Sequence, residues 1–188
     1  MPICVSPICF QAMAHPDGEL AIVRAVASVD TAVGVSIYST YSLEDVARES
    51  PNTVKFMQIQ FYKDRQLMVD LLKRAEKAGY NAVILTVDIP IEVLPEIVEA
   101  VRGTGVEVYM DSGVRLGTDV LKALALGARA VFVGRPVIWG LAYKGEQGVT
   151  KVLEMLRHEL KVAMALAGCA SLKDITPSLV MRHAASHL

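Results

Sequence analysis

The fold of this chain is decided by two segments, Met110-Asp111-Ser112-Gly113-Val114-Arg115-Leu116-Gly117 and Ala130-Val131-Phe132-Val133-Gly134-Arg135-Pro136. Each begins with a short apolar run typical of a buried strand and continues into a turn that contains Gly and Arg. An alanine- and leucine-rich stretch between them, from Thr118 to Gly127, predicts a helix. The local order is therefore strand, turn, helix, strand, turn.

Both turns offer groups that suit a phosphate. Gly113 and Gly134 allow backbone N–H groups to approach an anion closely, and the planar guanidinium groups of Arg115 and Arg135 match phosphate oxygens. In a barrel of alternating strands and helices, the last two strand-to-helix loops commonly form a phosphate site. Asp111, at the end of its strand, is predicted to accept hydrogen bonds from ligand hydroxyl groups, with a helix N-cap as the alternative. For the two arginines the alternative is a surface salt bridge.

The rest of the chain repeats the same unit. Apolar, β-branched runs alternate with helical patterns, so that six strands each precede a helix. This alternation predicts an α/β protein with a parallel sheet, either a β/α barrel or a doubly wound open sheet. No Gly-x-Gly-x-x-Gly follows the first strand, which favours the barrel. The predicted strands are 2–5, 33–37, 55–61, 81–87, 106–110 and 130–133, and the predicted helices are 18–29, 42–45 onward, 64–78, 91–101, 118–127 and 149–167.

Composition narrows the functional classes. The chain has 188 residues, of which 53% are hydrophobic and 21% charged, with a formal net charge of -1. These values predict one globular domain and argue against a nucleic-acid partner. No apolar run is long enough to span a bilayer, so no membrane partner is expected. Three cysteines without a recognisable signal peptide indicate reduced thiols inside a cell, and the four histidines do not have the spacing of a metal site.

These segments resemble the FMN-dependent 2-hydroxy-acid oxidases, the glycolate oxidase and hydroxyacid oxidase family. Residues 2–19 are similar to the family's first barrel strand and flavin-contacting loop and include Met13-Ala14-His15-Pro16-Asp17-Gly18-Glu19. Residues 93–148 are similar to its C-terminal βα units. The resemblance covers nearly the whole chain and implies a TIM-type (β/α) barrel with FMN as cofactor.

The resemblance also implies a set of binding residues. Asp111 matches the aspartate that binds the ribityl chain, and Tyr38 and Gln60 match substrate positions, where Gln60 replaces the tyrosine that is usual in the family. The substrate would be a small 2-hydroxy acid and the electron acceptor O2, and the resemblance leaves room for a homo-oligomer. The expected FMN-binding residues are Pro7, Ile8, Cys9, Ser36, Gln58, Thr86, Asp111, Gly113, Arg115, Gly134 and Arg135.

The chain departs from the family pattern in the middle of the barrel. Pro90 is joined directly to Ile91, where the family has a long segment that contains strands five and six, a lysine near the flavin and the Ser-Asn-His-Gly-x-Arg motif with the catalytic base. The family's N-terminal region before the first strand is also missing, and Ser112 replaces a family glycine. We therefore expect residues 1–188 to form a single but incomplete FMN-dependent domain, reduced to six βα units, with the junction near 90–91.

The predicted function follows from the residues that match the family and from the family segments that this chain does not contain. By resemblance the protein is an (S)-2-hydroxy-acid oxidase that converts a 2-hydroxy acid to a 2-oxo acid with FMN. No catalytic residue can be assigned, because the base is lost with its motif, so weak or no activity is expected. The alternative is a non-catalytic isoform or fragment that binds FMN weakly or pairs with full-length subunits. An unrelated phosphate-binding barrel enzyme would explain the Gly-Arg turns only.

Three smaller features carry expectations of their own. The chain ends in Ser186-His187-Leu188, which resembles the Ser-Lys-Leu type of peroxisomal address and predicts a peroxisomal location. Cys9 is expected to be a packed thiol rather than a nucleophile. His15, which follows the first strand, is expected to make a structural hydrogen bond.

Overall fold

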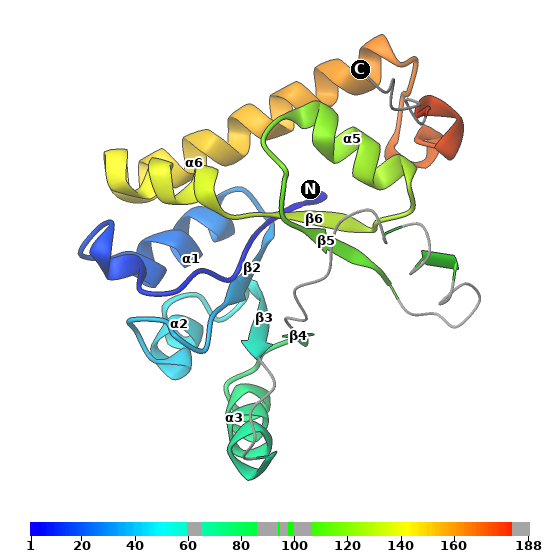
Figure 1. The fold of residues 1–188 in the computed structure, drawn as a ribbon. Helices are drawn as coiled ribbons and strands as arrows, with labels where there is room; N and C mark the ends of the chain where they lie inside the picture. Colours follow the sequence, from blue (N-terminus) through cyan, green and yellow to red (C-terminus); the bar gives the residue numbers. More distant parts are fainter. Residues whose placement is uncertain (60–64, 86–93, 95–97, 100–106, 182–188) are drawn as a thin grey trace, which may run out of the picture.

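Six parallel strands form one curled sheet with helices on its outer side (Figure 1). The computed structural model describes residues 1–59, 65–85, 94, 98–99 and 107–181. The strand order is β4-β3-β2-β1-β6-β5, and all pairs are parallel. The strands are β1 (Ile3–Val5), β2 (Ala32–Val35), β3 (Val54–Ile59), β4 (Ala82–Leu85), β5 (Tyr109–Asp111) and β6 (Ala130–Val133).

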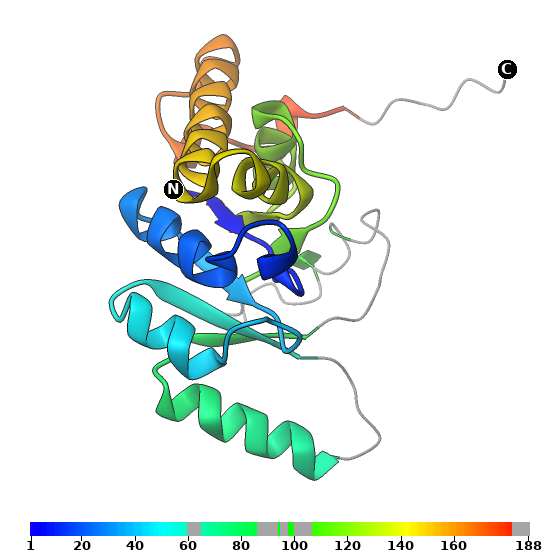
Figure 2. The same ribbon diagram turned by 90° about the vertical axis from the view of Figure 1, so that its left-hand side faces the viewer.

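The helices follow the strands in turn, as the alternating pattern predicts. Figure 2 shows α1, α2 and α3 stacked along one side of the sheet, with α5 and α6 continuing the outer layer. Short 3-10 helices lie at Gln11–Met13, Leu172–Asp174 and Pro177–Leu179. The α-helices are α1 (Gly18–Ser28), α2 (Leu43–Glu49), α3 (Arg65–Lys77), α5 (Gly117–Ala125) and α6 (Arg135–Leu166). None of the helices in the described ranges is long and apolar enough to cross a membrane.

The sheet is a reduced barrel, which confirms the predicted fold class. All six predicted strands are present, with bounds that differ from the expected ones by at most three residues. The predicted helix 91–101 lies largely outside the described residues. The predicted helix 149–167 corresponds to the second half of α6, after a break at Lys144 and Gly145. The first half, which begins at Arg135, was not predicted, because Pro136 and Gly140 within it and Gly145 and Gly148 after it are poor helix residues.

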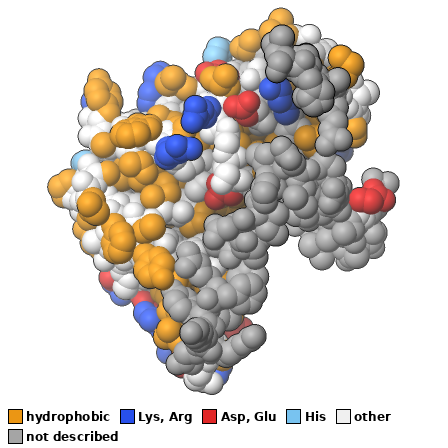
Figure 3. All heavy atoms as spheres, in the orientation of Figure 1, with side chains coloured by type: hydrophobic (Ala, Val, Ile, Leu, Met, Phe, Trp, Pro, Cys, Tyr) orange, Lys and Arg blue, Asp and Glu red, His pale blue; other side chains and the backbone are white. Residues whose placement is uncertain are grey.

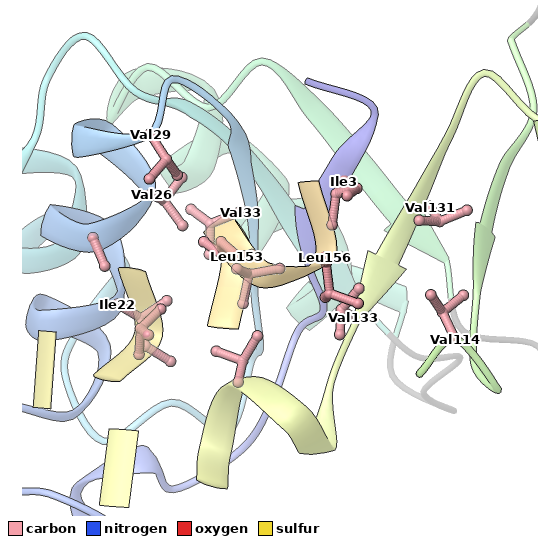
Figure 4. Packing of buried hydrophobic residues seen from close by; sticks show 14 of the residues in the cluster. Ile3, Ile22, Val26, Val29, Val33, Val114, Val131, Val133, Leu153 and Leu156 are labelled. Carbon is pink, nitrogen blue, oxygen red and sulfur yellow. The ribbon is translucent and has the colours of Figure 1, made fainter. Parts of the chain in front are cut away.

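The main core lies between the sheet and the outer helices. Ile3 and Val5 of β1 and Val131 and Val133 of β6 point to this layer and are fully buried. Figure 4 shows Ile3, Val131 and Val133 in the same cluster as Ile22 and Val26 of α1 and Leu153 and Leu156 of α6. The burial of such side chains contributes about 1.5 to 3 kcal/mol each, so this layer holds the helices against the strands.

The inner face of the sheet carries a second, smaller cluster. Alternate residues along a strand point to opposite faces, and Cys4 and Phe132 accordingly pack with Ala32 and Ala130 on the concave side. The rings of Phe56, Tyr109 and Phe132 lie with centroids 5.7 to 6.2 Å apart. This apolar layer lies on the inner face of β1, β2, β3, β5 and β6.

A buried lysine stabilises the opposite, N-terminal edge of the sheet. Lys55 is 1% exposed, and its ammonium donates hydrogen bonds to the carbonyl oxygens of Ser50, Pro51 and Thr53. Burial lowers the pKa of this ammonium. Lys55 therefore closes the turn between α2 and β3, far from the C-terminal strand ends.

Candidate functional site

A pocket of about 650 Å³ opens at the C-terminal ends of β1, β5 and β6. Its location fits the expected phosphate site, because both Gly-Arg turns contribute to it. In Figure 3, basic side chains and a broad hydrophobic area share the face turned to the viewer. The lining residues are Ser6, Pro7, Ile8, Asp111, Ser112, Gly113, Val114, Arg115, Phe132, Gly134, Arg135, Pro136, Ile138 and Trp139.

Asp111 is held in place from two sides. Its Oδ1 atom accepts hydrogen bonds from Ser6 Oγ, at 2.7 Å, and from the backbone N–H of Ser112, at 2.6 Å. Ser6 is fixed in turn, because its backbone N–H donates to the carbonyl of Val133. The carboxylate therefore sits at the pocket with a defined orientation, as a residue that accepts ligand hydroxyl groups requires.

Sequence reasoning missed Ser6. Its side chain joins β1 to Asp111 at the end of β5, although the two residues are 105 positions apart in the chain. The signal that could have found it is its place directly after the first strand, where ligand-contacting side chains of a parallel sheet collect. Ser6 is 5% exposed, which agrees with a role in orienting Asp111.

The second Gly-Arg turn places a helix N-terminus at the pocket. Gly134 precedes α6, with φ −97° and ψ −93°, and its carbonyl accepts from Val137 N and Ile138 N. Arg135 is the first residue of the helix and is exposed. The positive end of the helix dipole and the guanidinium both favour an anion here.

The first Gly-Arg turn is fixed by Asp119 of α5. Gly113 has φ +78°, and the backbone N–H groups of Arg115 and Leu116 both donate to Asp119 Oδ2. These bonds leave the Arg115 side chain outside the turn, where it lines the pocket. Within the described part of the chain, neither Arg115 nor Arg135 forms an ion pair, so both guanidinium groups are available to an anionic ligand.

Ser112, the residue that departs from the family glycine, adopts a backbone conformation that suits glycine. Its φ is +84°, in the left-handed region, where a side chain is strained by about 1 to 2 kcal/mol. We expect Ser112→Gly to stabilise the protein by about 0.5 to 1 kcal/mol, since part of the relieved strain is offset by the greater freedom of glycine in the unfolded chain. Urea unfolding of both proteins measures this difference. Ser112→Ala is the control, because it keeps the strain, and a glycine variant no more stable than the alanine variant would contradict the explanation.

The remaining predicted residues lie along the same edge but not all in this pocket. Pro7 and Ile8 line it, whereas Cys9, in the next position, does not. Cys9 is exposed, so the expectation of a packed thiol is wrong: it lies in the loop after β1, where the following residue, Phe10, is exposed as well. Ser36 and Gln58, at the ends of β2 and β3, are both 5% exposed, and Gln58 Oε1 accepts from the backbone N–H of Ile37 at 3.4 Å.

Two predicted substrate residues, Tyr38 and Gln60, and the predicted flavin contact Thr86 remain to be placed. Tyr38 is 41% exposed and lies next to Phe10, with ring centroids 6.4 Å apart. Thr86 and Gln60 lie outside the described residues. His15 Nδ1 accepts a hydrogen bond from the backbone N–H of Asp17, as expected for a structural histidine.

Two ionisable side chains of the inner face of the sheet, Tyr109 and Cys4, pack against the pocket residue Phe132 and are uncharged at physiological pH. Burial raises the pKa of Tyr109 to about 12, helped by the hydrogen bond that its hydroxyl donates to Glu107. Burial also raises the pKa of the Cys4 thiol. Neither group is therefore suited to abstract a proton at neutral pH. The charged side chains that line the pocket are Asp111, Arg115 and Arg135.

Comparison with known proteins explains this arrangement. The family model described as FMN-dependent dehydrogenase matches residues 1–92 and residues 89–182. The chain is 36% identical to 2-hydroxyacid oxidase 1 of Mus musculus over 292 residues, which cover 97% of the chain and 79% of the relative. It is 32% identical to the peroxisomal (S)-2-hydroxyacid oxidase GLO4 of Arabidopsis thaliana over 278 residues, with 93% and 76% covered.

A solved structure gives the same answer. A mandelate oxidase with (S)-2-phenylpropionate superimposes with a TM-score of 0.84 at 31% identity, covering 92% of this chain and 76% of that structure. The alignment with the mouse relative is longer than the 188 residues of this chain, so the matched region of the relative contains residues without a counterpart here. The fold, the two matched parts and the similarity over nearly the whole chain agree: this protein belongs to the FMN-dependent dehydrogenase family.

Proposed function

We propose that this chain binds FMN at the pocket between β1, β5 and β6, and that its own oxidation of 2-hydroxy acids is weak or absent. The observation that carries the proposal is the shared pocket of the two Gly-Arg turns, where Arg115, Arg135 and the start of α6 face the same space as Asp111. A phosphate ester with a hydroxylated chain matches this combination of donors and one fixed acceptor. The matching family model, FMN-dependent dehydrogenase, and a mandelate oxidase structure that contains an FMN adduct support FMN as this ligand.

Each group has a definite task in holding FMN. Arg115 and Arg135 would donate to the phosphate oxygens, with the dipole of α6 adding to their charge. Asp111, oriented by Ser6, would accept from the ribityl hydroxyl groups. Ser36 and Gln58, buried at the neighbouring strand ends, are proposed to bond the flavin ring, as is Thr86.

Bound FMN would accept the electron pair of the substrate's α C–H bond and would pass this electron pair on to O2. The protein must remove the hydroxyl proton and hold the carboxylate. No residue of this chain matches the family's base motif, since Pro90 is followed directly by Ile91. Loss of a general base costs about 10² to 10⁴ in rate, which is the reason for the weak activity proposed here.

The test separates binding from turnover. The purified protein is mixed with FMN, freed of excess ligand and examined by visible absorption, and a small 2-hydroxy acid is then added without O2. We expect a retained flavin band that the acid bleaches slowly or not at all. No retained band would refute FMN binding, and rapid bleaching would refute the proposed weak activity.

We also propose the single incomplete domain and the peroxisomal location. The two parts of the family match meet at residues 89–92, which supports a junction near 90–91. Ser186-His187-Leu188 lies outside the described residues, and the proposal rests on its sequence and on the peroxisomal relative. Microscopy of the protein with a fluorescent label at its N-terminus, with and without these three residues, tests the address.

A second candidate function is association with a full-length subunit without catalysis. The observation behind it is the sheet order, in which β4 and β5 form the two edges and, among the described residues, do not pair with each other. Unpaired edges offer backbone groups to another chain. Size measurement of a mixture with a labelled full-length relative would show a joint species if this function is correct, and two separate species if it is not.

A further inference from the structure

The loop after β1 and the loop after β2 pack directly on each other beside the pocket. The backbone N–H of Phe10 donates to the carbonyl of Tyr38 at 3.0 Å, and Ala12 N donates to Thr40 Oγ1 at 3.3 Å. The first loop contains Ile8, which lines the pocket, and the second begins at Ser36. A ligand that contacts both Ile8 and Ser36 therefore requires a fixed distance between the two loops.

Glu19 lies between these two loops. It belongs to the first turn of α1, is 3% exposed, and uses one oxygen for both loops: Oε1 accepts from Gln11 N at 3.3 Å and from Thr40 N at 2.8 Å. Gln11 extends the connection toward the pocket, because its Nε2 donates to the carbonyl of Ile8 at 3.1 Å. Glu19 has no ion-pair partner among the described residues, so charge neutralisation does not explain its burial.

The second oxygen of the Glu19 carboxyl group, Oε2, takes no part in joining the two loops. Glu19 Oε2 and the neighbouring Gln11 Oε1 are both buried and accept no hydrogen bond within the described structure. Both are acceptors, and buried acceptors without donors are costly. Oε2 therefore makes no contribution to the connection of the loops, which depends on Oε1 alone.

We propose that Glu19 is a positioning residue, which holds the loops after β1 and β2 as one unit at the rim of the FMN pocket. Its Oε1 atom performs this task through two backbone N–H groups, and its negative charge is not required. Glutamine in this position keeps the accepting oxygen and adds donors where Oε2 stands. The effect on the ligand rests on the proposed FMN binding, whereas the connection of the loops does not.

The first test measures amide hydrogen exchange of Gln11 and Thr40 in the protein without FMN. In Glu19→Ala both amides are expected to exchange at least about tenfold faster, because both lose their acceptor. In Glu19→Gln both are expected to stay protected. The amide of Val131, which bonds to Pro2 at the far end of β1, reports global unfolding and should not change.

The second test measures FMN affinity by flavin fluorescence. Glu19→Ala is expected to bind about tenfold more weakly than the original protein, and Glu19→Gln with unchanged affinity. Lys55→Met is the control for simple loss of stability, since Lys55 lies at the opposite edge of the sheet, and it should leave both loop amides and FMN affinity unchanged.

The outcomes separate the two proposals. If the original protein binds no FMN, the proposed function fails, but amide exchange still decides whether Glu19 joins the loops. Faster exchange in only one loop, or a glutamine variant as impaired as the alanine variant, would overturn the inference. The inference would also be overturned if Lys55→Met changed the loop amide exchange and the FMN affinity as much as Glu19→Ala does.

Discussion

Replacing Arg115 and Arg135 together by methionine is expected to lower the affinity of this chain for FMN by at least about 100-fold. A hydrogen bond to a charged group contributes about 1.5 to 3 kcal/mol, and every 1.4 kcal/mol changes affinity tenfold. Both guanidinium groups are exposed at the pocket and free of ion pairs with described residues, so their loss leaves no carboxylate unpaired. Methionine keeps much of the side-chain length, so the change removes charge more than volume.

Riboflavin makes the experiment specific, because it has the same ring and ribityl chain without the phosphate. The double variant should bind riboflavin as well as the original protein does, while losing FMN. Arg129→Met is the matched control: Arg129 pairs with Glu107 outside the pocket, and its loss should affect neither ligand. Equal losses for riboflavin and FMN would show that the arginines hold the fold of the pocket and not the phosphate.

Sequence reasoning succeeded where one short segment contains the whole signal. β6 has the predicted bounds, and the Gly-Arg turns that follow β5 and β6 form one pocket, as parallel strands require. Ser112 in the first turn was recognised as a departure from the family glycine, and its φ of +84° shows that the backbone there has a conformation that favours glycine. These features depend on local backbone chemistry, which a single sequence displays.

It failed where the signal depends on contacts between distant segments. The sequence singles out Asp111 and the motif that ends in Glu19, but not their partners: Ser6 is 105 positions from Asp111, and Thr40 is 21 positions from Glu19. The first half of α6 was missed because Gly140, Gly145 and Gly148 are poor helix residues when only local propensity is considered. The reason for those glycines appears only when the two halves of the helix are placed side by side.

Gly148→Ala is expected to destabilise the protein by about 3 to 5 kcal/mol, among the largest effects available to a single methyl group. The long helix α6 breaks at Lys144 and Gly145, where the backbone is not helical, and its two halves meet at Gly140 and Gly148. A Cβ atom on Gly148 would lie 1.8 Å from the carbonyl oxygen of Gly140, which is backbone and cannot rotate away. The halves would have to separate, and the first half begins at the second Gly-Arg turn, Gly134-Arg135.

Urea unfolding compares this variant with Gly79→Ala, which separates collision from backbone strain. Gly79 has φ +82°, and a methyl group added there would meet no described atom within 4 Å, so alanine should cost only about 1 kcal/mol. Gly148 has no positive φ, so its cost comes from the collision alone. If both variants lost the same small amount, the close approach of the two helix halves would not be needed for stability. A large loss for Gly148→Ala alone would show that the backbone packing of the two helix halves, the first of which begins at the second Gly-Arg turn, stabilises the protein.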